Sequence, residues 1–412
     1  MLFCFSANGQ TELSTSKTGF TLQEALQIAR VNNPVLKTEF SNIGIAQSEL
    51  ISAKLRSNPN LSNETLQLLQ PSEFANDTRW INGYNREVTW QLSAPFQIAG
   101  QRKNKIDIAN KSIDLEISNY AEVERNLFSE VAEKWLEIWI AQKQIDIIEI
   151  AKKNIDSLVL TNQIRYKNQV ITQTDLFRTE LLAKQYALQY KSAQQELINL
   201  LKEFQLVLGI NETANIDIND NFIFDNPPTL DNLLNQSLQE RSDVIAAKSM
   251  IDVSNSNIKL QKSLAYPQPE IGVLWNPQNK VQYFGISAAI DLPFFSRNQG
   301  EIKKSFIIKE QAENHLYTVQ NFLKTEIETA YDSYQLQQQN IENYEAVLIQ
   351  SNIILENVKY AYLKSGTTII DYLEAQRSWL ETQQQYYDAL FQYRQSYVQL
   401  LSATGLINQL AQ

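Results

Sequence analysis

Residues 362–376 have the sequence YLKSGTTIIDYLEAQ, and residues 166–180 have the sequence YKNQVITQTDLFRTE. The leading Tyr and the first Asp stand at the same places in both segments. The same spacing relates Leu208-Gly209 to Thr404-Gly405 without an insertion. A segment that recurs at a fixed spacing indicates an internal duplication. We therefore expect two copies of one structural unit in this chain.

The duplication extends toward the N-terminal part of each half. A Thr-Leu pair before a helical pattern occurs at residues 21–22 and again at residues 229–230, and Pro-bearing turns follow at 56–61 and 266–271. Each half is therefore predicted to be a helix, two strands and a pair of long helices. The predicted divisions are a signal-peptide remnant and disordered N-terminus at 1–19, a first repeat at 20–209 with a β-hairpin at 59–96 and a long helical pair at 101–208, and a second repeat at 210–412 with a helix at 229–265, a β-hairpin at 269–293 and a long helical pair at 300–404.

The long helical segments carry apolar residues every seven positions. These residues are Ile106, Ile113, Tyr120 and Leu127 in the first half, and Ile341, Leu348, Leu355, Tyr362 and Ile369 in the second. Sustained heptads favour coiled-coil packing. A helix of about 65 residues would be roughly 100 Å long, so we expect it to need neighbours along its whole length.

The segments between the helices alternate apolar and polar residues, which is typical of strands. The alternation is clear in residues 88–94, 271–275 and 284–292. Five aromatic residues lie in or beside these segments and suggest a girdle at a membrane interface: Trp80, Tyr84, Trp90, Trp275 and Tyr283. A soluble hairpin packed on a helix, with ordinary core aromatics, is the alternative interpretation.

Composition excludes several classes of function. The 412 residues carry a net charge of -10, which offers no basic surface for nucleic acid. The chain has one histidine, His315, and one cysteine, Cys4, and it has no phosphate loop, nucleophile elbow or ligand cluster. We expect no enzymatic activity, no cofactor and no bound metal. Lipidation of Cys4 remains an open alternative within the signal-like N-terminus.

Strand number constrains how the chain could cross a membrane. No apolar run approaches the roughly 18 residues that a spanning helix needs, so any spanning segment would be a strand. Two hairpins supply four strands, whereas a closed transmembrane barrel needs about eight, and open edges are not tolerated in lipid. Three chains together would supply twelve strands. The same symmetry would bring the long helices together.

This organisation, together with the segment at 362–376, resembles the TolC family of outer-membrane efflux proteins from about Phe20 to Leu406. Within that family, residues 56–61 and 100–103 resemble most the heavy-metal branch, which serves cobalt, zinc, cadmium or copper pumps. The resemblance implies a mainly α fold with a small β part: duplicated antiparallel coiled coils form a periplasmic α-barrel, and four strands per chain contribute to a trimeric 12-stranded transmembrane β-barrel. It also implies a passive exit channel in the outer membrane of a Gram-negative bacterium, with a periplasmic adaptor and an inner-membrane pump of the RND type as partners.

The resemblance also implies roles for particular residues. Asp371 and Glu374 match the pore constriction of the family, and acidic rings in a trimer would favour cations. Residues implied at the helix tips, where the adaptor makes contact, are Val170, Thr172, Asp175, Tyr362, Gly366, Thr367 and Asp371. We expect Gly366 to adopt a positive φ and to end its helix, and Asp175 and Asp371 to cap the returning helices.

Several alternatives remain open at this stage. The acidic pair could be a solvated surface, as most acidic residues are. The cargo could be a drug, another small organic molecule or a protein. In a different class, a soluble structural coiled-coil protein would explain the heptads, although not the hairpins or the duplication.

Overall fold

The computed structural model describes residues 19–218, 227–278 and 281–411. The first half contains α1 (Leu22–Asn32), α2 (Pro34–Lys54), β1 (Asn60–Gln67), β2 (Arg86–Pro95), α3 (Gln101–Lys167) and α4 (Gln173–Leu208). The second half repeats this order with α5 (Leu230–Glu240), α6 (Ser242–Leu264), β3 (Glu270–Gln278), β4 (Val281–Ala289), α7 (Gln299–Leu363) and α8 (Ile369–Thr404). Short 3-10 turns lie at η1 (Pro71–Glu73), η2 (Gly83–Asn85) and η3 (Ile407–Ala411). The prediction of a mainly α fold with four strands is confirmed, while the signal-like N-terminus with Cys4 lies outside the described residues.

The chain forms two compact units, and each draws on both repeats. The first unit comprises Met1–Lys37, Val123–Arg241 and Leu323–Gln412, and the second comprises Thr38–Glu122 and Ser242–Phe322. The division in space therefore does not follow the duplication. Among the helices of the described residues, none combines the length and apolar character needed to cross a membrane.

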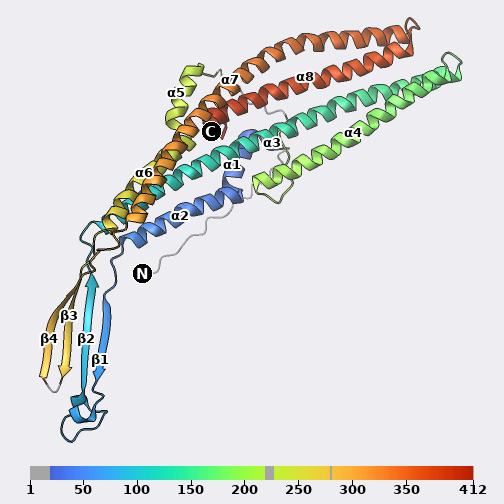
Figure 1. The fold of residues 1–412 in the computed structure, drawn as a ribbon. Helices are drawn as coiled ribbons and strands as arrows, with labels where there is room; N and C mark the ends of the chain where they lie inside the picture. The colour runs from blue at the N-terminus through green and yellow to red at the C-terminus, as the bar shows by residue number, and fades with distance from the viewer. Residues whose placement is uncertain (1–18, 219–226, 279–280, 412) are drawn as a thin grey trace, which may run out of the picture. The chain divides into compact units, whose positions relative to one another are not determined.

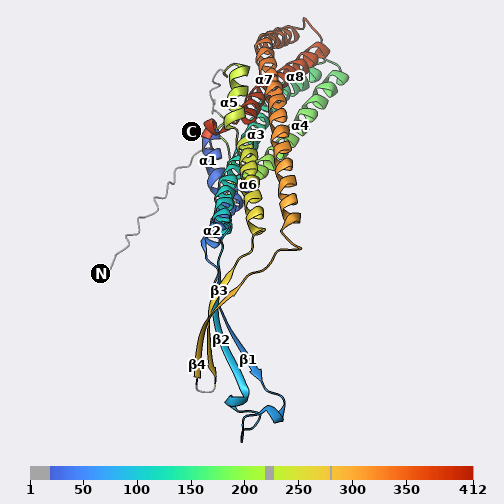
Figure 2. The same ribbon diagram turned by 60° about the vertical axis from the view of Figure 1, so that its left-hand side comes forward.

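The second unit contains one antiparallel sheet in the order β1-β2-β3-β4 (Figure 2). Each hairpin pairs internally, and β2 pairs with β3, which places Trp90 directly opposite Trp275. Paired residues point to the same side of a sheet, so one side is largely apolar. This apolar face consists of Leu61, Val88, Trp90, Leu92, Ala94, Ile271, Val273, Trp275, Phe284, Ile286 and Ala288. Its members on β4 are widely exposed, with Phe284 at 76% and Ile286 at 79%.

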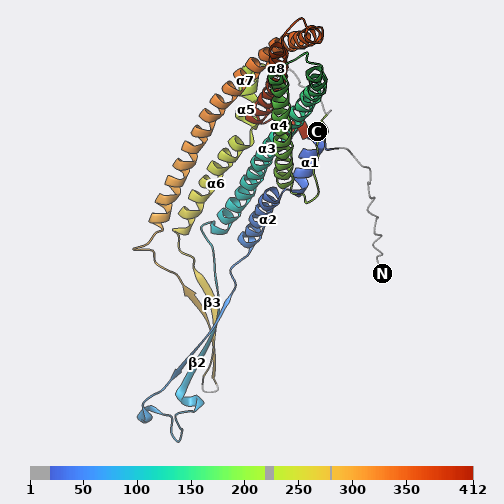
Figure 3. The same cartoon turned by 90° about the vertical axis from the view of Figure 1, so that its right-hand side faces the viewer.

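The other side of the sheet is mostly polar. The Asn276 amide donates to the Glu87 carboxylate at 3.0 Å and to the Thr89 hydroxyl at 3.2 Å, across the β2–β3 pair. Four helical segments of the same unit lie in a row in the order α2, α3, α6, α7 (Figure 3). The order of the helices therefore follows the order of the strands to which they connect.

The first unit contains the distal parts of the long helices as two antiparallel pairs, α3 with α4 and α7 with α8 (Figure 1). Their core includes the predicted heptad residues Leu355, Tyr362 and Ile369, all of which are buried. The turns of the two pairs lie at the same end. Because residues from both pairs share one apolar cluster, the two tips form a joint structure within this unit.

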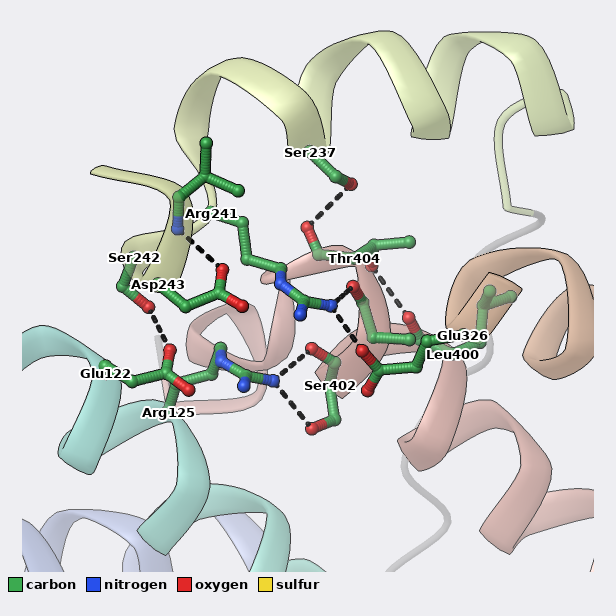
Figure 4. A network of polar contacts seen from close by, with 12 residues as sticks. Glu122, Arg125, Ser237, Arg241, Ser242, Asp243, Glu326, Leu400, Ser402 and Thr404 are labelled. Atoms are coloured by element: carbon green, nitrogen blue, oxygen red, sulfur yellow. Dashed lines mark hydrogen bonds and ion pairs between the residues drawn. The ribbon is translucent and has the colours of Figure 1, made fainter. Parts of the chain in front are cut away.

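The opposite end of each pair is fixed by a polar side chain that follows a short helix. The Asn33 amide donates to the Val207 carbonyl at 2.8 Å, and the Arg241 guanidinium donates to the Ala403 carbonyl at 2.7 Å. Arg241 also contacts the Glu326 carboxylate at 2.7 Å (Figure 4). These contacts join α1 to α4 and α5 to α8 in the same way.

The prediction of a single helix at 229–265 is wrong, because two helices, α5 and α6, occupy this range. The chain is extended at Arg241, with φ -67° and ψ 132°, so α5 ends at Glu240. The break turns the Arg241 side chain toward the last turn of α8, where unpaired carbonyl groups need donors. Asn33 interrupts the first half in the same manner, with φ -57° and ψ 125°.

Candidate functional site

The turns at the two tips have the same backbone geometry. Gln169 and Ser365 adopt left-handed conformations, with φ of 59° and 60°. In the first turn the Val170 amide donates to the Arg165 carbonyl at 2.8 Å, and in the second the Gly366 amide donates to the Ala361 carbonyl at 2.8 Å. These bonds, with one from each left-handed residue to a Tyr carbonyl, form a Schellman motif.

The expectation that Gly366 would have a positive φ is therefore wrong. Ser365 carries the left-handed conformation, and Gly366 follows it. The Schellman motif needs one left-handed residue immediately after the helix, and a polar residue can occupy it at a modest cost. Val170 stands at the place of Gly366 in the first turn and fits there because that position requires no positive φ.

Each returning helix starts with a complete capping box. The Thr172 hydroxyl accepts from the Asp175 amide, and the Asp175 carboxylate accepts from the Thr172 amide, both at 3.2 Å. Thr368 and Asp371 repeat this arrangement at 3.0 to 3.2 Å. The prediction that both Asp residues cap their helices is confirmed, with Thr as the N-cap residue and Asp at the third helical position.

The carboxylate of Asp371 has more hydrogen bonds than capping alone requires. It also accepts from the hydroxyl groups of Thr367 and Thr368, each at 2.6 Å. Hydrogen bonds to the ionised form lower the pKa of Asp371, and the bond from Thr367 contributes most. Asp371 therefore remains charged at any pH near neutrality.

Glu374 lies one turn further along α8 and is exposed. Its carboxylate is 4.0 Å from the Arg377 guanidinium, a contact that partly offsets its charge. Within the described residues there is no group of three or more His, Cys, Asp or Glu side chains that could hold a metal ion. The acidic pair is thus one carboxylate held by hydrogen bonds and one exposed carboxylate beside Arg377, both on the same helix.

A buried cluster of polar side chains joins the first tip to the second. The Tyr362 hydroxyl donates to the Asn162 side-chain oxygen at 2.7 Å, and the Asn162 amide donates to the Thr179 hydroxyl at 2.9 Å. Asn162 and Thr179 are fully buried and Tyr362 is 2% exposed. Burial raises the pKa of Tyr362, so its hydroxyl remains a donor.

Arg165 adds a second connection between the tips. Its guanidinium donates to the Tyr362 carbonyl at 3.2 Å and to the Ser365 hydroxyl at 3.4 Å. The guanidinium carbon also lies 4.6 Å from the centre of the Tyr362 ring, a cation–π contact. Arg165 therefore contacts the second tip through both the carbonyl group and the aromatic ring of Tyr362.

Sequence reasoning singled out Tyr362 but missed Asn162, Arg165 and Thr179. The signal was available in the duplication, because their counterparts in the second repeat are Val358, Ala361 and Ala375. A polar residue that becomes apolar in the other repeat marks a place where the repeats have different neighbours. Tyr166, the counterpart of Tyr362, accordingly is 39% exposed.

The remaining predicted residues are distributed over both units. At the tips, Val170 and Thr172 are exposed, while Thr367 and Asp175 are half-buried. The five predicted interface aromatics all lie in the sheet or in the β1–β2 connection, with exposed fractions of 40 to 59%. All five belong to the second unit, and none of them is buried. Their membrane role stays a prediction.

A family model, two relatives and a solved structure are similar to this chain. The model of the family described as "Outer membrane efflux protein" matches residues 25–209 and 233–406. The cobalt-zinc-cadmium resistance protein CzcC of Cupriavidus metallidurans is 22% identical, over 90% of this chain and 87% of the relative. The pyoverdine export outer membrane protein OpmQ of Pseudomonas putida is also 22% identical, over 93% of this chain and 85% of the relative. A crystal structure of a membrane protein from Pseudomonas aeruginosa has the same fold, with a TM-score of 0.78, 16% identity, and coverage of 97% and 96%.

Proposed function

The chain belongs to the outer membrane efflux protein family, and from this membership we propose that three copies form a passive exit duct of a tripartite pump. The duct would lie in the outer membrane of a Gram-negative bacterium, with its helical part in the periplasm. Its partners would be a periplasmic adaptor and an inner-membrane pump of the RND type. The observation that carries this proposal is the family match, which extends over both repeats.

The sheet supports assembly into a trimer. Its order leaves β1 and β4 as the outer strands of the described sheet, and four strands are too few to close a barrel. Open edges are not tolerated in lipid, so β4 of one copy would pair with β1 of the next. Twelve strands would then form a barrel with the apolar face toward lipid and the polar face toward the lumen.

The tips support the same assembly through the duplication. Tyr362 and Leu373 are buried against the first pair, at 2% and 4% exposure, whereas their counterparts Tyr166 and Phe177 are 39% and 56% exposed. In a ring that alternates the two repeats, Tyr166 and Phe177 would pack against the second pair of the next copy. There they would contact Val358 and Ala375, the apolar counterparts of Asn162 and Thr179.

Heavy-metal cations are the proposed cargo. One relative is a cobalt-zinc-cadmium resistance protein, and rings of Asp371 and Glu374 would favour cations over anions. A second candidate is a small organic molecule, because the pyoverdine export relative is equally similar. In either case the cargo passes through the duct without a chemical step.

Two measurements test this proposal. The full chain, purified in detergent, should have the mass of a trimer, and a monomeric species would contradict the assembly. In planar bilayers, Asp371→Asn with Glu374→Gln should lower the preference for cations, while the matched variant Asp175→Asn, which alters the same cap at the first tip, should leave it unchanged. An unchanged preference in the double variant would reject the acidic constriction.

The cargo requires a separate test in cells. A strain that lacks this gene should become more sensitive to cobalt, zinc or cadmium salts, and the wild-type gene should restore resistance. Sensitivity to organic compounds with unchanged metal tolerance would favour the second candidate.

A further inference from the structure

Two sequence segments that the efflux function does not explain lie together in the second unit. Residues 56–57 follow α2, and Gly100, Arg102 and Lys103 lie at the start of α3. Both groups line one pocket of about 610 Å³ at the end of β2. Its lining residues are Arg56, Ser57, Ala94, Pro95, Phe96, Gln97, Gly100, Arg102 and Lys103.

The pocket is built to attract an anion. Three of its lining side chains are cationic, and none of the described residues that line it is acidic. It also includes the start of α3, a 67-residue helix whose first amide groups and dipole favour negative charge.

The wall of the pocket is fixed before any ligand arrives. The Arg102 guanidinium donates to the Lys54 carbonyl from Nε at 3.1 Å and from Nη2 at 2.6 Å. This contact ties the end of α2 to the start of α3. Arg56 and Lys103, which are exposed, remain as the cations that can turn toward an incoming anion.

The pocket also opens onto apolar surface. Ala94 belongs to the apolar face of the sheet, and Phe96 and Ile98 beyond it are 50% and 65% exposed. An anion held here could therefore carry a hydrocarbon chain that lies along the apolar face. A phosphate group at the end of acyl chains has this combination of charge and apolar surface.

The second repeat provides a built-in contrast. The corresponding pocket, of about 660 Å³, is lined by residues 264–268 and 291–293 among others, and its charged side chains are Glu270 and Asp291. It contains no cation among its described lining residues. The charge of the first pocket is therefore a property of that repeat and not of the fold.

We propose that the pocket lined by Arg56, Arg102 and Lys103 binds a phosphate group, presented by a phospholipid headgroup at the base of the sheet. The inference rests on the proposed function, because in the cell lipid reaches this pocket only when the sheet lies in a membrane. Each copy would then hold one headgroup, and the trimer three.

The test is native mass spectrometry of the full-length trimer in detergent, titrated with phosphatidylglycerol. Arg56→Gln with Lys103→Gln should weaken binding about five-fold for each charge removed, or about 25-fold for both. The matched control is Lys303→Gln with Lys304→Gln, which removes two charges from the start of α7 outside the pocket and should leave binding unchanged. Arg56→Lys with Lys103→Arg should also bind as the wild type does, which excludes a general folding defect.

A second arm identifies the source of the phosphate. If millimolar inorganic phosphate fails to displace the lipid, the headgroup is the ligand, and if it displaces the lipid, the same site serves free phosphate. Equal binding by the double variant and the wild type, or an equal loss in the control, would overturn the proposal. Conductance of the same variants separates the two inferences, because a normal channel without lipid binding rejects only the phosphate site.

Discussion

The two helix tips have the same backbone conformation but differ in their surroundings. Both turns use a Schellman motif followed by a Thr–Asp capping box, with hydrogen bonds that agree closely in length. The Tyr that precedes each turn is nevertheless buried in the second tip and partly exposed in the first. Local hydrogen bonds therefore determine how each tip turns, and the residues across the interface determine how firmly it is held.

The largest expected effect is the loss of the buried aromatic ring. Tyr362→Ala should destabilise the second tip by about 3 to 5 kcal/mol, the usual cost of removing a buried aromatic side chain. Hydrogen exchange of the amides of residues 355–380 measures this local stability. In monomeric protein, Tyr166→Ala is the matched control and should cost clearly less, and equal losses would contradict the asymmetry.

Removal of the connecting cation should have the next largest effect. Arg165→Ala should lower the stability of the second turn by about 2 kcal/mol, because it removes hydrogen bonds from a charged donor and the contact with the Tyr362 ring. Arg165→Lys should restore little of this loss, since Lys cannot reproduce the planar arrangement of donors.

The control for Arg165 is Lys167→Ala, a charge removed from the same helical turn. Exchange of the amides of residues 362–368 should increase in the Arg165 variants and stay near the wild-type rate in the control. Similar changes in both would mean that charge alone, and not the contact with the second tip, stabilises the turn.

The caps should behave alike, because their geometry is the same. Thr172→Ala and Thr368→Ala should each cost about 1 kcal/mol at the start of the returning helix. Amide exchange in the first turns of α4 and α8 checks this expectation. A large difference between the two would show that the tips differ in local structure as well as in packing.

Acid should loosen the second tip through Asp371. Its pKa is lowered in the folded state, so its contribution to stability is complete above about pH 4 and is lost as the pH falls through the lower folded value. A spin label at position 364, in a chain with Cys4→Ser, should become more mobile below pH 4. Asp371→Asn should abolish this dependence on pH, and persistence of the dependence would assign it to another group.

The smallest expected effect is at the turn glycine. Gly366→Ala should change stability by less than about 0.5 kcal/mol, because Gly366 has no positive φ and an added Cβ would lie 3.4 Å from the Ala361 carbonyl oxygen. Gly405→Ala, at a φ of 78°, should cost more. Thermal unfolding of the two variants distinguishes these positions.

Much of the local structure followed from the sequence. The duplication, the helical pairs, the strands and the two capping Asp residues were all predicted from spacing and residue type. The pairing of β2 with β3 was not, because it joins Trp90 to Trp275 across a long separation that no local pattern describes. The break at Arg241 was missed for a similar reason, since its partner Ala403 lies far along the chain.

The residues of the candidate site were likewise predicted only in part. Tyr362 was identified by its place in the repeat, but its partners Asn162 and Thr179 were missed, because their contacts with Tyr362 form only when the helices lie side by side. Only the apolar residues at the equivalent places of the second repeat marked them in the sequence. The sequence analysis expected the positive φ at Gly366, one position after Ser365, which adopts it. Glycine can adopt a positive φ but is not required to do so.

By itself, the sequence determined what each segment becomes, because helix periods, strand alternation and caps depend on residues within a few positions of one another. The tertiary structure alone decided which of two equivalent Tyr residues is buried and which of two equivalent pockets is basic. Those properties depend on side chains contributed by separate segments, and burial and electrostatic attraction act through space and not along the chain. The duplication supplied two similar tips, and packing made them different.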